Sequence, residues 1–211
     1  MTVAELISLT RGHFDTFDSG EALTHLQAVH NNICRLVRVL PDESVDVSIT
    51  AGASEYPIAD LLRIWDAAYW KSATDSKALI PRSVDQMDLE THGAWRRDQS
   101  STPVWYDERA GSLVLHPAPD TTTASGYPKV VLSVSLVQPL DMTTSLPAVA
   151  DHEAWLYGLC RRYAAMKAAY KLQMFMALEQ EAMNKLRRFS QGKAARQKPN
   201  LRPMVPRVRV V

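Results

Sequence analysis

Hydrophobic positions in the first forty residues recur at helical spacing. Thr2 and Glu5 have the spacing of a capping box, in which the two side chains satisfy free backbone donors at the start of a helix. A second helix is expected from a cap at Ser19 to about Leu40, where Pro41 ends it. One face of this second helix carries Leu23, Leu26, His30, Ile33, Val37 and Leu40 at steps of three and four residues.

From residue 42 the pattern changes to a period of two, which is typical of strands. VDVSIT alternates, LLRIWDAAYW is rich in bulky residues, and TPVWYDERAGSLVLHPAPD predicts a hairpin with its turn at Glu108–Gly111. KVVLSVSLVQP has an entirely apolar face made of Val130, Leu132, Val134 and Leu136, as in a sheet packed on one side. A short helix capped by Ser83 is expected at SVDQMDLE.

The helical pattern returns at Asp151 and continues to about Gln191, with Gly158 as the only glycine inside it. An apolar stripe is predicted from Trp155, Leu159, Tyr163, Met166, Tyr170, Met174 and Leu178. One helix of this length spans roughly 60 Å, which exceeds a small domain. The helix is therefore expected either to break near Leu172–Phe175 or to pack its far end against something outside the domain.

These patterns predict an α+β protein, in which the N- and C-terminal helices form a bundle with a central antiparallel β insert and an extended C-terminal arm. The expected parts are N-terminal helices at 1–41, a β-rich insert at 42–147, a long helix at 148–191 and a basic arm at 192–211.

Charge is distributed unevenly along the chain. Residues 1–184 hold 15 basic and 23 acidic side chains, a net of −8, whereas all nine charged residues after Glu181 are basic. This asymmetry indicates a partner for the arm, which could be nucleic acid, an acidic protein surface or another copy of the acidic body.

Sequence signatures of catalysis are missing. The chain has no G-x-G-x-x-G, no P-loop, no H-E-x-x-H and no G-x-S-x-G, and its six histidines are scattered. We therefore predict no enzyme, no catalytic residue, no cofactor and no metal. Cys34 and Cys160 are predicted to be buried free thiols in a reducing compartment, and no apolar run is long enough to span a bilayer.

A family resemblance rests on the order of several segments: Leu79-Ile80-Pro81, Val104-Trp105-Tyr106, the stretch from Leu113 to Asp120, the strand from Val130 to Pro139, and a helix entered through Leu146-Pro147. This order resembles the head-to-tail adaptor (connector) proteins of tailed bacteriophages over roughly residues 20–175. The resemblance implies a homo-oligomeric ring, commonly a dodecamer, in the neck of the virion below the portal protein. It further implies synthesis in the host cytoplasm, a tail tube, nozzle or stopper protein as a second partner, and double-stranded DNA that passes through without sequence-specific binding.

The arm has features of a docking strand. Arg207, Val208, Arg209 and Val210 alternate, so one edge offers valines and the other arginines, as expected of a strand added to a partner's sheet. Three prolines keep the arm extended, and it can reach at most roughly 70 Å. The candidate portal-docking residues are Arg196, Lys198, Arg202, Met204, Val205, Arg207, Val208, Arg209, Val210 and Val211. We expect the DNA channel to be lined by acidic or neutral side chains, because basic contacts would hold DNA through counterion release.

Two alternatives remain open. A nucleic-acid-binding protein could use Lys185–Arg188 together with the arm, in which case its affinity for free DNA would fall steeply with salt. The chain could instead be another ring protein of the neck, such as a stopper or tail-completion protein, although its long C-terminal helix favours the adaptor.

Overall fold

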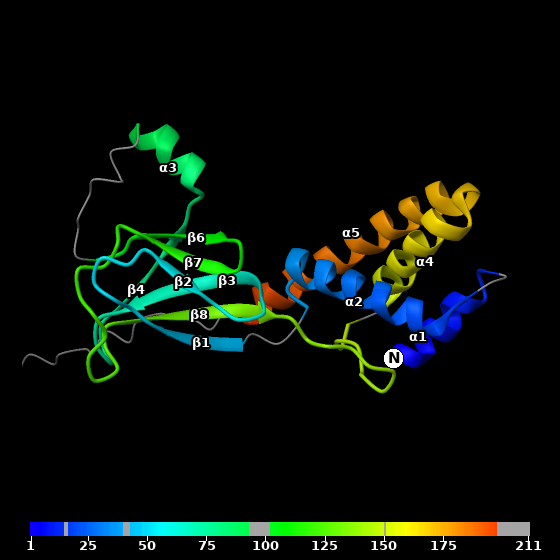
Figure 1. Ribbon diagram of the computed structural model, residues 1–211, viewed down its shortest axis with the longest axis horizontal. Helices are drawn as coiled ribbons and strands as arrows, with labels where there is room; N and C mark the ends of the chain where they lie inside the picture. Colours follow the sequence, from blue (N-terminus) through cyan, green and yellow to red (C-terminus); the bar gives the residue numbers. More distant parts are fainter. Residues whose placement is uncertain (15–16, 40–42, 93–101, 150, 198–211) are drawn as a thin grey trace, which may run out of the picture.

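A computed structural model describes residues 1–14, 17–39, 43–92, 102–149 and 151–197. It contains a helical bundle beside a β insert, so the α+β fold class is confirmed (Figure 1). The bundle consists of α1 (Val3–Arg11), α2 (Ser19–Leu36), α4 (Glu153–Lys167) and α5 (Leu172–Gln197), with a 3₁₀ turn at Ala169–Lys171. A separate short helix, α3 (Val84–Thr91), projects from the insert.

The N-terminal caps follow local sequence rules with one correction. Thr2 Oγ1 accepts a hydrogen bond from the amide of Glu5, and the Glu5 carboxylate accepts one from the amide of Thr2, which confirms the capping box. Asp18, not Ser19, caps α2: its Oδ1 accepts from the amides of Gly20 (2.7 Å) and Glu21 (3.0 Å). An extended backbone at Asp18 and a carboxylate charge at the positive end of the helix make it the better cap.

Helix α2 is shorter than predicted, because it ends at Leu36 and not at Leu40. Val37 has an extended backbone (φ −139°, ψ 132°), and both Val37 and Val39 are buried in the bundle core. The chain thus straightens where it leaves the bundle, while its valines still fill the interior. Leu40 and Pro41 lie outside the described residues.

The C-terminal helical stretch breaks at Ala168 (φ −151°, ψ 62°), a few residues before the predicted place. The chain then reverses, so α5 runs antiparallel to α4. Arg161 pairs with Glu179 (2.6 Å), and Lys185 pairs with Glu153 (3.1 Å). This reversal buries the second helix against the first, which explains how such a long helical segment fits a small domain.

The predicted apolar stripe is wrong between Tyr163 and Leu178, although Leu178 itself packs against the bundle core. Met166, Tyr170 and Met174 are 46%, 81% and 50% exposed, because the reversal at Ala168 turns them away from the core. A different set of α5 residues is buried instead: Phe175, Ala182, Met183 and Leu186.

Helix α4 is the centre of the bundle. Trp155 is fully buried, and its indole Nε1 donates to His30 Nδ1 on α2 (3.2 Å). Gly158 permits close packing: a Cβ at this position would stand 2.7 Å from Val29 Cγ1 of α2 and 3.3 Å from Glu179 Oε1 of α5. The only glycine predicted inside this helical stretch thus marks the point where three helices meet.

Both cysteines are free and buried, as predicted. The thiol sulfur of Cys34 lies 3.6 Å from His30 Nε2. Burial lowers the pKa of His30 to about 4 and raises the pKa of the Cys34 and Cys160 thiols to about 12. These groups are therefore neutral members of the core at physiological pH.

The described residues of the insert form two four-stranded sheets. The first has the order β1 (Glu43–Ser48), β8 (Lys129–Leu136), β3 (Leu61–Trp70), β4 (Ser76–Ala78), and all its pairs are antiparallel. The second has the order β2 (Glu55–Pro57), β7 (Ser112–His116), β6 (Trp105–Arg109), β5 (Ile80–Pro81), with β5 parallel to β6. The longer strands and the β6–β7 hairpin are confirmed, whereas β2, β4 and β5 are too short for a period to be recognised.

The two sheets pack face to face on a small core of their own. Val130, Leu132 and Val134 of β8 point into it, as the alternation predicts, together with Leu113 and Leu115 of β7. The opposite face of the first sheet therefore lies on the outside of the molecule.

Candidate docking surfaces

The predicted docking residues lie at or beyond the C-terminal end of the described residues. Helix α5 runs to Gln197, six residues past the expected boundary at residue 191, so Arg196 belongs to its last turn. The side chain of Arg196 and the other candidates lie outside the described residues: Lys198, Arg202, Met204, Val205, Arg207, Val208, Arg209, Val210 and Val211.

The structure does establish where the arm begins. The last part of α5 reaches the junction between the bundle and the insert (Figure 1). Ser190 Oγ donates a hydrogen bond to the carbonyl oxygen of Arg38 (3.0 Å), in the segment that joins α2 to β1. Leu186, one turn earlier, is buried in the bundle core. The arm therefore leaves the bundle beside the insert.

Arg38 connects this junction to the outer face of the first sheet. Its guanidinium donates to Asp66 Oδ2 (3.0 Å) and to Ser133 Oγ (2.9 Å). It also lies 5.9 Å from the centre of the Trp65 ring, within the range of a cation–π contact. The Trp65 indole is held in turn by a hydrogen bond to Ser135 Oγ (2.7 Å).

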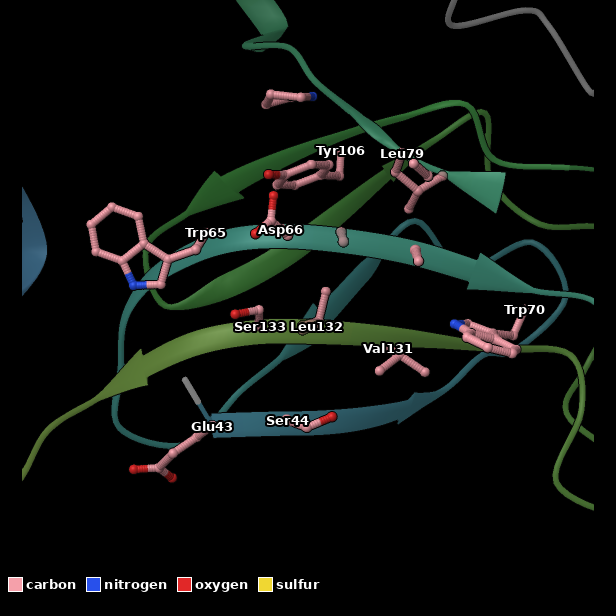
Figure 2. A pocket seen from close by; sticks show the side chains of 14 residues that line it. Glu43, Ser44, Trp65, Asp66, Trp70, Leu79, Tyr106, Val131, Leu132 and Ser133 are labelled. Atoms are coloured by element: carbon pink, nitrogen blue, oxygen red, sulfur yellow. The ribbon is translucent and has the colours of Figure 1, made fainter. Parts of the chain in front are cut away.

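A hollow of about 430 Å³ occupies this face, a size typical of ligand pockets. Figure 2 shows Trp65 and Trp70 at its two ends along β3, with Val131 and Ser133 of β8 between them. We call this region the hollow; its lining residues are Glu43, Ser44, Trp65, Asp66, Ala67, Ala68, Trp70, Ala78, Leu79, Pro81, Tyr106, Val131, Leu132 and Ser133.

Strand register explains the shape of the hollow. Ala68 pairs with both Val131 and Ala78, so small side chains lie side by side across three strands. A bulge in β3 between Ile64 and Asp66 leaves Trp65 without a partner opposite it on β8. Ala68, Ala78 and Val131 thus form a low surface between the two tryptophans, and Leu79, Pro81 and Tyr106 line the hollow from the side of the second sheet.

A second exposed apolar surface covers the tip of the α4–α5 hairpin. Met166, Tyr170, Met174 and Met176 are all exposed there. Lys171 lies 5.6 Å from the Tyr170 ring and donates to the carbonyl oxygen of His13. The sequence placed Met166 and Met174 in an apolar stripe, and the position of the chain reversal explains why both are exposed.

The described residues contain no group of three or more histidine, cysteine, aspartate or glutamate side chains placed to hold a metal ion. None of their helices combines the length and the apolar character needed to cross a membrane.

Comparisons with known proteins identify the family of the chain. The model of a family described as SU10 adaptor protein matches residues 1–207, nearly the whole chain and most of the arm. No curated protein matches the chain. The resemblance noted in the sequence is confirmed, and the chain belongs to the SU10 adaptor protein family, a family of bacteriophage head-to-tail adaptors.

Proposed function

We propose that the protein forms a ring below the portal of a tailed bacteriophage, extends the DNA channel and provides the platform to which the tail attaches. The observation that carries this proposal is the family match, because it includes the bundle, the insert and the arm as far as Arg207. Its position in the virion is then the neck, and its action is binding without chemical conversion of a substrate.

The arm is the proposed attachment to the portal. It begins where α5 leaves the bundle, and its candidate residues combine cations with evenly spaced valines. Valines on one edge suit the apolar pockets beside a partner's sheet edge, whereas arginines suit carboxylates there through charge-assisted, often bidentate, bonds.

The hairpin tip is proposed to contact a neighbouring subunit of the ring. Contiguous exposed apolar side chains on a folded protein mark interaction surfaces, and methionine adapts to the shape of a partner. Burying Tyr170 and Met174 between subunits would remove from water the two most exposed of these four side chains.

Weak interaction with DNA follows from the charge of the body. With a net of −8 over residues 1–184, the ring repels phosphates, so DNA can slide through the channel.

Negative-stain microscopy of the full-length protein mixed with purified portal tests the proposal, and a collar beneath the portal is expected. Arg207→Ala/Arg209→Ala should weaken portal binding at least about tenfold through lost charge-assisted bonds. The matched control is Arg187→Ala/Arg188→Ala, which removes the same charge from exposed positions on α5 and should retain binding.

Two outcomes would contradict the proposal. A chain truncated after Gln197 that still forms the collar would exclude the arm as the attachment. Binding of free duplex DNA that falls steeply with salt, and is lost in the Arg187/Arg188 control, would favour the nucleic-acid alternative.

A further inference from the structure

The hollow on the first sheet has the features of a binding site for an extended peptide. Its floor is made of small side chains, its ends are the half-buried rings of Trp65 and Trp70, and its lining includes the carboxylates of Glu43 and of Asp66, which pairs with Arg38. An occupant that fits should carry small or medium apolar side chains between cations.

We propose that the hollow is the docking site of the chain's own residues 198–211, which occupy it before the arm engages the portal. This inference goes beyond the proposed function: it concerns the unassembled protein, and it holds or fails whether or not the arm binds the portal.

Geometry places the arm within reach of the hollow. Ser190 of α5 contacts the backbone of Arg38, and the side chain of Arg38 contacts Asp66 and Ser133 in the hollow. The helical residues from 191 to 197 advance the chain by about 10 Å. The 14 residues that follow can extend over about 45 Å, which exceeds the length of any strand in the insert.

The chemistry of the arm complements that of the hollow. Val208 and Val210 have the size to lie on the floor formed by Ala68 and Val131, which leaves alternate side chains to face the rim. Those alternate residues are arginines. An arginine can pair with a carboxylate or stack on a tryptophan, and Arg38 already does both within this chain, with Asp66 and Trp65.

Intramolecular docking needs only a weak contact. A short tether keeps the arm at an effective concentration in the millimolar range, so an interaction of millimolar affinity is already substantially occupied. A portal that binds the arm more tightly than the hollow does then draws the arm out of the hollow, because the arm occupies the site with the greater affinity. The docked arm covers the half-buried Trp65 and Trp70 until assembly begins.

Limited trypsin digestion of the full-length protein, without portal, tests the proposal. The bonds after Arg207 and Arg209 are cleavable, and a synthetic peptide of residues 198–211 gives the rate for the free segment. An arm docked nine-tenths of the time should be cut about tenfold more slowly than the peptide. Equal rates would overturn the proposal.

Substitutions in the hollow test whether the arm is protected from trypsin by docking there. Ala68→Arg places a long charged side chain on the floor of the hollow and should restore the peptide's rate, with folding checked by circular dichroism. Ala177→Arg is the matched control, since Ala177 is exposed on α5, and it should leave the protection intact. If Ala68→Arg does not fold, Trp70→Ala serves in its place.

The dependence of protection on protein concentration distinguishes an arm docked on its own chain from an arm docked on a second copy. Protection within one chain is the same from about 1 to 100 µM, whereas protection that grows with protein concentration shows docking on a second copy and would overturn the intramolecular site. Protection that persists in the hollow variants would show that the arm binds elsewhere and would also overturn it.

Discussion

The bundle and the insert are built on different kinds of contact. In the bundle, partners lie far apart in the chain: His30 and Trp155 are 125 residues apart, and Asp18 and Tyr163 are 145 residues apart. The insert occupies the continuous stretch between α2 and α4 and has an apolar core of its own. The bundle therefore joins the N-terminal and C-terminal parts of the chain. The insert is formed by the continuous segment between them.

The tryptophans of the two regions also differ in burial. Trp155 is sealed inside the bundle with its N–H satisfied by His30, whereas Trp65 and Trp70 stand half-buried on the outside of the insert. A large aromatic side chain buried with its polar group bonded serves stability, while one left half-exposed beside a hollow is available to a partner.

The largest effect is expected from breaking this contrast directly. Trp155→Ala should lower the free energy of unfolding by about 3–5 kcal/mol, because it leaves a cavity and an unpaired His30 in the core. Trp70→Ala, the matched change on the insert, should cost under about 1.5 kcal/mol. Urea denaturation measures both, and equal losses would show that the outer face of the sheet is as tightly packed as the bundle core.

Acid should weaken the bundle through His30. Its pKa is about 4 in the folded protein against 6.5 when exposed, so between these values the unfolded chain binds more protons. Stability is fully present above pH 6.5 and falls by up to about 3 kcal/mol as the pH drops through 4.

The His30→Gln variant isolates this contribution. Its side-chain oxygen can accept the Trp155 indole N–H but does not titrate, so the difference between wild type and variant should change with pH over this window. The free energy of unfolding is measured for both proteins from pH 7 to pH 4. If it changes with pH by the same amount in the two proteins, His30 is not the source of the acid sensitivity.

Gly158→Ala sharpens the comparison within the bundle. The new methyl group would stand 2.7 Å from Val29, so overpacking should cost about 1–3 kcal/mol of unfolding free energy. Adding Val29→Ala removes the clashing group, and the double variant should be more stable than the sum of the two single changes predicts. Additive losses would mean that the helices separate freely at this point.

The smallest effect is expected at the link between the two regions. Arg38→Met should lower stability by less than about 1 kcal/mol, because the Asp66 side chain of the pair is 72% exposed and water screens the attraction. Asp66→Asn should have no added effect once Arg38 is replaced, and a double-mutant cycle by urea denaturation measures this coupling. A loss of several kcal/mol would show that the two regions depend on each other for folding.

Much of the fold could be predicted because its signals are local. The capping box at Thr2 and the alternation of Val130, Leu132 and Val134 are set by neighbouring residues, and the structure confirms both. The short strands β2, β4 and β5 were missed because two or three residues carry no measurable period.

The candidate sites were less predictable. The arm was found from its composition, but the hollow depends on which strands lie side by side, and no local pattern shows that Ala68 meets Val131 and Ala78. The bulge that leaves Trp65 at the end of the hollow likewise arises from pairing with a strand some seventy residues away.

The sequence by itself determined that helices form both the N-terminal and the C-terminal part of the chain. It also determined the alternating insert, the basic arm and the adaptor family. Tertiary structure alone decided that the long C-terminal helix reverses at Ala168, because no proline or glycine marks that position. Burial of Phe175 against the bundle offers more free energy than continuing a helix into water, and this energy depends on contacts that form only when distant segments meet.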